Sequence, residues 1–456
     1  MSAVAKESVP ALLWRLWRDP AAWSTTVDVF AILIAVSLPW STTLVAIFSA
    51  ALLVSIVPFL AVKAFLTSLK RPICWLPMAL FVLAAVGTLW SHAPWSERLY
   101  AVGPIAKLLV LPVLLFHFER SGRGVLVFIA FIASCALLMT VSWIVAFNPH
   151  LALKSGAEYG VPVKNYIDQS QEFALCTVVL AYPVITLLRE KSIRLAVLLI
   201  VLSLGFVLNM LFVIVSRTAL VTMPIMLTVF VLPRLRWRSI AIIACATAGL
   251  GGLVWATSPQ LRRTAETFLT DYQIYQERNI PTSIGLRLEF WRKSLRFISE
   301  APVFGHGTGS IHGLFEKAAV DQFGAAAAVV ANPHNQTLNV AIQWGTIGIV
   351  LLYAMWLLHL LLFRGESLAT WIGLMVVVQN ILTSLFNSHI SDFNEGWMYV
   401  LGVGIAGGAV LRAGSREGRV SEKFNQTMMT DMNMRDELSV ASRWFSLDFV
   451  RYRPAK

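Results

Sequence analysis

Charged residues are scarce in this chain. Of its 456 residues only 14% are Asp, Glu, Lys or Arg, whereas 57% are hydrophobic and the mean hydropathy is +0.69. A globular protein has about 25% charged residues, so this shortage excludes a protein with water as its main solvent. Apolar runs close to the roughly 20 residues needed to cross a bilayer recur along most of the chain. The sequence therefore predicts an all-α polytopic membrane protein.

Signals for disulfides and metals are also missing. The cysteines all fall inside apolar runs without a CxxC pair, and they are Cys74, Cys135, Cys176 and Cys245. This arrangement indicates neither a disulfide framework nor a zinc site, and we expect core thiols. No DxD motif or closely spaced acidic pair occurs on the expected outer side to hold a metal on diphosphate oxygens. We therefore expect metal-independent chemistry without a cofactor.

The net charge of +12 bears on topology, because excess Lys and Arg in a membrane protein marks cytoplasmic loops rather than a nucleic-acid partner. Hydropathy and turn signals predict about twelve spans. They lie at 27–40, 42–62, 72–91, 98–117, 123–146, 171–189, 193–215, 218–234, 238–257, 337–363, 369–387 and 395–412. One alternate set of connections holds basic clusters at 63–71, 120–123, 189–194 and 234–238. We expect that side, with both termini, to be the cytoplasm.

The spans divide the chain into five regions. They are an N-terminus at 1–26 that is cytoplasmic or interfacial, transmembrane helices 1–9 at 27–257, a periplasmic catalytic loop at 258–335, transmembrane helices 10–12 at 336–412 and a cytoplasmic tail at 413–456. Residues 9–23 carry Arg15 and Arg18 and no small-residue cleavage site, which predicts an interfacial helix instead of a cleavable signal peptide. The polar stretch 412–456 is expected to be largely disordered, with 441–450 as a candidate short helix.

The loop at 258–335, about eighty residues long, is far longer than a connector requires, so extracytoplasmic function is expected there. Within it, 284–299 has the periodicity of an amphipathic helix. The expected apolar face is Leu288, Trp291, Leu295 and Ile298, and the expected polar face is Glu289, Arg292, Lys293 and Arg296. Arg287 breaks this pattern, because at about 100° per residue it projects within roughly 40° of Trp291. Such a cation is either paired or snorkelling, or it is held for an anionic ligand.

Three further cations lie in apolar surroundings. Arg217 sits between two apolar runs at the outer boundary, where a charge either snorkels to the headgroups or faces a protein cavity. Lys107 lies about nine residues into the fourth span and is a functional-site candidate, the alternative being structural pairing with a carbonyl or a carboxylate. Arg98, at the outer end of the same span, is a further candidate for substrate binding.

A histidine stands where the tenth span begins, in the order Asn332, Pro333, His334, Asn335. Asn332 is the expected N-cap and Pro333 the first helical residue. His334 would then face the positive end of the helix dipole, which lowers the pKa of its imidazole and favours a neutral ring. The alternative is a polar residue that is merely satisfied at the interface. Gly345, eleven residues on, would let a neighbouring helix approach closely.

The glycine-rich segment 305–309 offers two interpretations. Its backbone N–H groups could hold a phosphate. However, it follows no predicted strand and lacks the lysine and hydroxyl pattern of a P-loop, so shaping the loop is the alternative.

Together these features resemble the O-antigen ligase and polymerase family of polyprenyl-diphosphate-dependent membrane glycosyltransferases. The resemblance rests on the number of spans, the large loop between the ninth and tenth, the segments 287–291 and 301–307, and the H(x10)G spacing from His334 to Gly345. It implies a GT-C-like fold in which Arg217 binds the diphosphate with a second arginine from the loop, and His334 acts at the acceptor.

The identity of the loop arginine depends on one departure from the family pattern. Family ligases are described by R(x3)L, whereas here Arg287 is followed at that spacing by Trp291, and Arg292 by Arg296. We assign the role to Arg287, which is also the arginine out of helical register, and keep Arg292 as the alternative.

The residue types agree with the implied chemistry. Two permanently charged, bidentate guanidinium groups suit the growing charge of a polyprenyl diphosphate leaving group without a metal. A neutral histidine can orient or deprotonate an acceptor hydroxyl, which typically contributes about 10²–10⁴-fold. The expected reaction is an inverting, single-displacement transfer of O-antigen from undecaprenyl diphosphate to the lipid A–core of lipopolysaccharide. The expected location is the periplasmic face of the bacterial inner membrane, in contact with membrane lipids.

Other functions fit part of this pattern. An O-antigen polymerase uses the same carrier but extends another lipid-linked glycan, and a protein O-oligosaccharyltransferase has a protein acceptor. A secondary transporter would also have about twelve spans and a buried cation, but it would not need so large an external loop or lack an obvious internal repeat. The sequence indicates neither the glycan, the acceptor sugar nor the oligomeric state.

Overall fold

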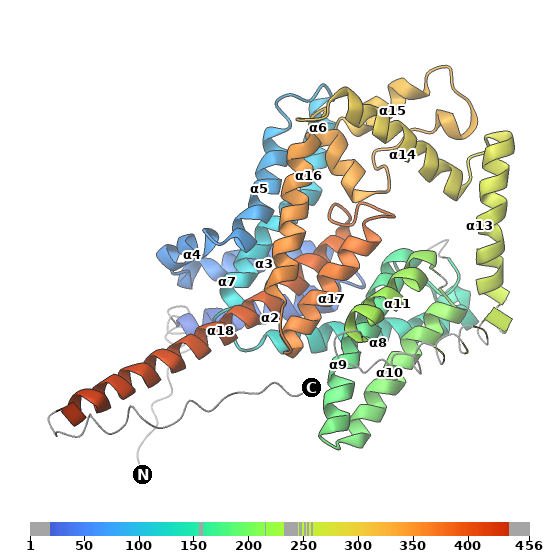
Figure 1. Ribbon diagram of the computed structural model, residues 1–456. Coiled ribbons are helices and arrows are strands. Elements are labelled where there is room, and N and C mark those ends of the chain that lie inside the picture. Colours follow the sequence, from blue (N-terminus) through green and yellow to red (C-terminus); the bar gives the residue numbers. More distant parts are fainter. Residues whose placement is uncertain are drawn as a thin grey trace, which may run out of the picture. The chain divides into compact units, whose positions relative to one another are not determined.

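The computed structural model describes residues 19–436 except 155–157, 215 and most of 232–258 (Figure 1). Every regular element in this described part is a helix. The chain divides into two compact units, Met1–Val410 and Leu411–Lys456. The contacts reported below lie within the first unit.

The helices follow one another along the chain with short 3-10 segments between some of them. The α-helices are α2 (Pro20–Ser37), α3 (Thr42–Ile56), α4 (Val62–Leu69), α5 (Pro72–Val86), α6 (Trp95–Val102), α7 (Val110–Phe118), α8 (Gly124–Phe147), α9 (Tyr166–Arg189), α10 (Ile193–Phe212), α11 (Arg217–Val231), α13 (Pro259–Arg278), α14 (Ser283–Glu300), α15 (Ile311–Ala319), α16 (Gln336–Leu362), α17 (Leu368–Thr383) and α18 (Phe393–Asp436). The 3-10 segments are η1 (Val57–Phe59), η2 (Gly103–Leu109), η3 (Pro149–Leu151) and η4 (Gly324–Ala327).

Within the described residues, 8 helices are long and apolar enough to cross a membrane, and there are 9 if α4 and α5, bent by 80°, form one span. Another span, Trp95–Phe118, is assembled from α6, η2 and α7. The protein is therefore a multi-pass helical membrane protein. The expected span at 238–257 lies almost wholly outside the described residues, and α17 is apolar but has only 16 residues. The total of about twelve spans stays a prediction.

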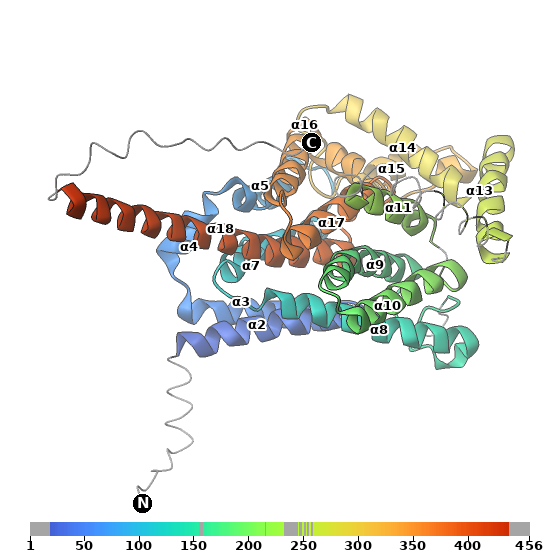
Figure 2. The same ribbon diagram turned by 60° about the horizontal axis from the view of Figure 1, so that its bottom comes forward.

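The first two spans form a tight hairpin, as their short connection suggests. The Asp19 carboxylate caps α2 by accepting from the Ala21 N–H, and the Ser41 hydroxyl accepts from Leu44 N–H at 3.2 Å to cap α3. Figure 2 shows α2 lying along α3 and α8. The first span thus begins at Pro20, earlier than expected. Of the predicted interfacial helix at 9–23, the residues up to 18 lie outside the described part.

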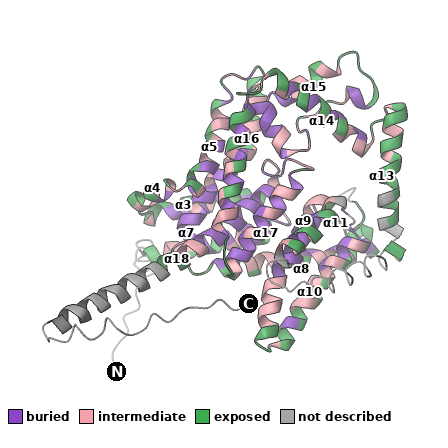
Figure 3. Ribbon diagram, viewed as in Figure 1, coloured by how far each residue is buried: buried purple, intermediate pink, exposed green. Residues whose placement is uncertain are grey.

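Buried residues concentrate along α9, α17 and the first half of α18, and in the first turns of α16 (Figure 3). The apolar part of α18 is 61% buried inside the protein, whereas that of α10 is 22% buried. Because α10 keeps most of its apolar surface uncovered, it belongs to the membrane-facing periphery. The second half of the chain thus supplies the central helix and, as shown below, most of the site.

Two expectations about polar and apolar stretches are wrong. The tail does not lose structure at Arg412, because α18 continues to Asp436, while 437–456 with the candidate helix at 441–450 lie outside the described residues. That stretch contains no proline and many good helix formers such as Arg, Glu, Lys and Met. Cys245 is exposed rather than a core thiol, while the other cysteines are buried. An apolar run signals burial in lipid as readily as burial in protein, so the pattern could not tell the two apart.

The predicted loop helix exists as α14, but its buried face is only partly the predicted one. Trp291 and Ile298 pack against a buried cluster as expected, whereas Leu288 and Leu295 are exposed.

Two residues of the expected polar face, Glu289 and Lys293, are buried. The Glu289 carboxylate accepts from its i,i+3 neighbour Arg292 at 2.8 Å and from the Tyr275 hydroxyl at 2.9 Å. The ammonium of Lys293 donates to a backbone carbonyl of η4. These partners stabilise the buried charges, and Tyr275 and η4 come from segments that helical periodicity cannot foresee.

Candidate functional site

The site is organised around a break in α16 at Gly345. This residue has φ +58° and ψ −151°, a backbone conformation open in practice only to glycine. A Cβ there would lie 2.3 Å from the carbonyl oxygen of Val303. The close neighbour is therefore the backbone of the turn after α14, and the expectation that a neighbouring helix would approach at Gly345 is wrong.

The break frees two carbonyls of α16, and the glycine-rich segment 305–309 uses them. The N–H of His306 donates to Ile342 at 2.8 Å and that of Gly307 to Gln343 at 2.9 Å. Further along the segment, the N–H of Thr308 donates to the Gly87 carbonyl at 3.0 Å and that of Gly309 to the Gln343 side chain at 2.8 Å. Because these N–H groups all donate to acceptors within the protein, they are not available to a phosphate. The phosphate-binding interpretation of the segment is therefore wrong, and the loop-shaping one holds.

His334 precedes α16 rather than beginning it. Asn335 is the N-cap, because its side chain accepts from the Leu338 N–H at 3.0 Å, and the helix begins at Gln336. The predicted cap at Asn332 is therefore wrong. His334 has φ +54°, a left-handed conformation that is uncommon outside glycine, and its ring stacks on Phe290 of α14 at 6.0 Å between centroids. The turn thus directs the imidazole toward the loop helix.

A chain of hydrogen bonds fixes which nitrogen of His334 carries the proton. The side-chain oxygen of Asn332 accepts from the backbone N–H of His334 at 2.9 Å and from the Ser388 hydroxyl at 2.7 Å. The amide nitrogen of Asn332 is therefore the group that faces Asn387, and it donates to the side-chain oxygen of Asn387 at 3.3 Å. The same oxygen lies 3.0 Å from Nδ1 of His334. Nδ1 therefore carries the hydrogen, and Nε2 keeps a lone pair that can accept a proton.

The electrostatic surroundings keep His334 neutral. Burial is the largest effect and lowers the pKa of the imidazole from 6.5, and the positive charge of Arg287 lowers it further. The hydrogen bond to Asn387 and the charge of Asp392 act in the opposite direction without cancelling these effects. The expected lowering of the pKa is thus present, but its main cause is desolvation and not the helix dipole.

The structure separates the two loop arginines. Arg287 is partly buried on α14 and close enough to His334 to affect its charge. The side chain of Arg292 is 71% exposed and engaged by Glu289. Of the two, Arg287 is the one whose charge acts on the histidine.

Arg217, Lys107 and Arg98 are the other predicted site residues. Arg217 is the first residue of α11, and its side chain lies outside the described part. The ammonium of Lys107, buried in η2, donates to the backbone carbonyls of Ser391 and Asp392, which matches the structural alternative. The guanidinium of Arg98 donates to the carbonyl of Ala93 at 2.6 Å, and also to that of Thr88, at the end of α5. Both groups hold backbone segments around the site.

A buried ionic cluster that no sequence pattern indicated lies in the connection between α17 and α18. Nδ1 of His389 lies 3.1 Å from Asp392 and 3.5 Å from Glu395, and ligand atoms of the three fall within 4.8 Å of one another. Burial opposes the charge of His389, but Glu395 and then Asp392 raise its pKa to about 10. In its protonated form this imidazole is ion-paired with the two carboxylates, and in its deprotonated form the same three groups are spaced to hold a metal ion. Asn387 likewise carries no sequence signal, because its role comes from contacts with Asn332 and His334 across the fold.

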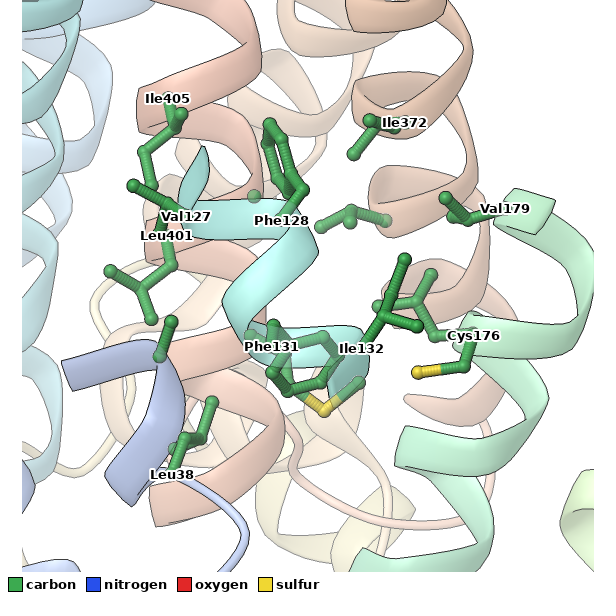
Figure 4. A pocket seen from close by; sticks show the side chains of 15 residues that line it. Leu38, Val127, Phe128, Phe131, Ile132, Cys176, Val179, Ile372, Leu401 and Ile405 are labelled. Atoms are coloured by element: carbon green, nitrogen blue, oxygen red, sulfur yellow. The ribbon is translucent and has the colours of Figure 1, made fainter. Parts of the chain in front are cut away.

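A small apolar cavity lies deeper between α2, α8, α9, α17 and α18 (Figure 4). It measures about 40 Å³, and the labelled side chains that line it are hydrocarbon apart from Cys176. A space of this size and chemistry is a packing defect rather than a substrate site.

Fold and site together define a class: a multi-pass helical membrane protein with a neutral histidine and a cation beside a broken helix. Residues 198–353 match the family model described as O-Antigen ligase, a segment that holds Arg287, His334 and Gly345. The resemblance seen in the sequence is therefore confirmed. The description of the matching family favours a transferase of the ligase type.

One relative is an uncharacterized protein of Haemophilus influenzae, 30% identical over 115 residues. The matched stretch covers 25% of this chain and 29% of that protein.

Proposed function

We propose that the protein is an O-antigen ligase of the bacterial inner membrane. It transfers O-antigen from undecaprenyl diphosphate to the lipid A–core of lipopolysaccharide at the periplasmic face. One arrangement carries this proposal: His334, whose Nδ1 bonds Asn387 and whose pKa is lowered by burial and by Arg287, lies in a segment that matches the ligase family, and no described residue bonds its Nε2.

The proposed reaction needs one base and stabilisation of one leaving group. Nε2 of His334 accepts the proton of the acceptor hydroxyl as that oxygen attacks the anomeric carbon of the donor. The bond between this carbon and the phosphate oxygen breaks, and its electrons remain on the polyprenyl diphosphate. Arg287, together with Arg217, stabilises the resulting charge by bidentate hydrogen bonds. Direct attack inverts the anomeric configuration, and neither a metal nor a covalent intermediate enters the scheme.

The test uses purified protein with lipid-linked O-antigen and rough lipopolysaccharide in the presence of a chelator. Wild type should form ligated lipopolysaccharide. We expect R287A and H334A to lose at least about 100-fold in rate, the scale of a general base or a charge-stabilising donor. The matched control is R296A, because Arg296 lies on the same helix but is exposed and pairs only with Glu300 among the described contacts. Thermal melting should show that all variants remain folded.

The identity of the glycosylated product separates the related activities. Sugar on lipopolysaccharide supports the ligase, sugar on another carrier-linked glycan supports a polymerase, and sugar on a protein supports a protein glycosyltransferase. Activity that disappears in chelator and returns with a divalent cation would contradict the metal-independent mechanism.

A further inference from the structure

A second cavity, of about 630 Å³, lies beside the histidine turn. It is bounded by α6 and η2, by the glycine-rich segment with the start of α15, and by the first turns of α16. Its polar and aromatic lining includes Glu97, Tyr100, His312, Asn332, Gln343 and Asp392. This volume falls within the range of about 300–1,000 Å³ that holds small-molecule ligands.

The lining has the chemistry of a site for hydroxyl groups. Carboxylates accept hydrogen bonds and side-chain amides both donate and accept them, whereas each sugar hydroxyl can do both. The side chain of Tyr100 is 82% exposed at the cavity, which leaves its ring face open for the apolar face of a sugar ring.

The carboxylate of Glu97 at the cavity wall is only partly satisfied. Oε2 accepts no hydrogen bond from the described residues, while Oε1 lies 3.6 Å from Nδ1 of His312. A carboxylate without donors is unfavourable in a partly buried place. The side chain is 35% exposed, so it can accept a hydrogen bond from a hydroxyl donor that enters the cavity.

The charge of the lining excludes the diphosphate part of the donor. Glu97 and Asp392 are acidic, and no lysine or arginine is found among the described residues that line the cavity. A diphosphate would be repelled there and is better accommodated at Arg287, which lies outside this lining. The occupant is therefore an uncharged, hydroxyl-rich part of a substrate.

The cavity also reaches the histidine turn. Asn332 lines it, and the Asn332 side chain accepts the backbone N–H of His334 at 2.9 Å. A glycan held in the cavity would thus lie beside the turn that carries His334.

We propose that this cavity binds the terminal sugars of the acceptor glycan. Glu97 and Asp392 accept hydrogen bonds from sugar hydroxyls, and Tyr100 packs against a sugar ring. That the bound sugar belongs to the acceptor rests on the proposed ligase function. That the cavity binds a neutral glycan does not depend on that function.

The test measures binding and turnover separately. Lipid-free core oligosaccharide from rough lipopolysaccharide is titrated into the full-length protein in nanodiscs without donor, by saturation-transfer NMR and calorimetry. We expect E97Q and Y100A each to weaken binding about tenfold or more, which corresponds to the loss of one charge-assisted hydrogen bond or one ring contact. Y100A is the variant expected to fold normally, because the ring of Tyr100 is exposed in the wild type. E300Q, an exposed acidic position on α14, should bind as wild type does.

In steady-state assays with E97Q, the KM for the acceptor should rise about tenfold while kcat and the KM for the donor stay near wild type. A rise in the donor KM alone would overturn the proposal by making the cavity a donor subsite. Unchanged binding in both variants would overturn it as well. Glu97-dependent binding without any ligation by wild type would support the cavity and reject the ligase function, so the two failures are distinguishable.

Discussion

The acid–base behaviour of His334 is set by groups from three separate stretches of chain. Arg287 and Phe290 come from α14, Asn332 from the turn before α16, and Asn387 from the turn after α17. Their effects on the imidazole oppose one another: burial and Arg287 disfavour the imidazolium, while Asn387 favours it. Protonation of this residue is therefore a property of the assembled site.

These opposing effects predict that substitutions of Arg287 and of Asn387 shift the pKa of His334 in opposite directions. In R287Q the pKa of His334 should rise toward 6.5, because a repelling charge is removed. In N387L it should fall further, because the hydrogen bond that raises it is lost. The measurement is an NMR titration of protein labelled with ¹⁵N histidine, with R296Q as the unchanged control. Shifts of the same direction in both variants would contradict the assigned environment.

The wild-type pH profile should follow the same logic. Activity requires the neutral imidazole, and its pKa lies below 6.5 in the fold. As pH falls, activity should therefore persist through 6.5 and decline only at lower pH, where His334 becomes protonated. The check is the acid limb of kcat/KM for ligation, and a midpoint at or above 6.5 would contradict a lowered pKa.

At the scale of elements, the broken helix α16 is the part that assembles the site. The break at Gly345 exposes carbonyls that receive the segment 305–309, and this segment in turn contacts the end of α5 through Thr308. The same segment forms one wall of the large cavity. A regular helix would offer none of these acceptors, because its carbonyls would be used internally.

Substitution of Gly345 should therefore affect stability and site together. G345A forces a positive φ on alanine and places its Cβ 2.3 Å from Val303 O, so we expect a loss of about 1–3 kcal/mol or more and strongly reduced ligation. The matched control is G313A, a glycine of α15 with nothing within 4 Å of its Cβ, which should be neutral or slightly stabilising. Thermal melting in detergent compares the two. Equal melting temperatures would show that the break is not required.

At the scale of the whole molecule, the protein is a set of apolar helices, and α13, α14 and α15 are inserted in the chain between α11 and α16. Peripheral helices such as α10 keep most of their surface for lipid, whereas α18 is enclosed. Several buried ionisable groups lie around the connection between α17 and α18 and the start of α9, whereas Asp28 of α2 pairs with His117 of α7 elsewhere. Ion pairs and carbonyls satisfy most of these charges, as a membrane location requires.

The proposed orientation makes a labelling prediction. In a C245S background, which removes the exposed native thiol, R296C on α14 should react with a membrane-impermeant maleimide added to spheroplasts. K191C, in the connection between α9 and α10, should react only after the membrane is opened. The reverse pattern would contradict a periplasmic site and cytoplasmic basic loops.

Much of the site was visible in the sequence because its residues violate local rules. Arg287 breaks an amphipathic pattern, His334 follows a proline at a helix start, and Gly345 interrupts an apolar run. Their partners were not visible. Asn387, Asp392 and Glu97 are ordinary polar residues in short connections or at helix ends, and only their neighbours across the fold give them a role.

The sequence by itself determined that the chain is helical, that it lies in a membrane, and that its unusual polar residues gather in the loop before α16. These properties follow from composition and periodicity, which act within a few turns of chain. Only the tertiary structure decided which face of α14 is buried, where α16 breaks and which nitrogen of His334 is free. Each of these depends on hydrogen bonds and charges between segments far apart in the chain, and such contacts leave no periodic signal.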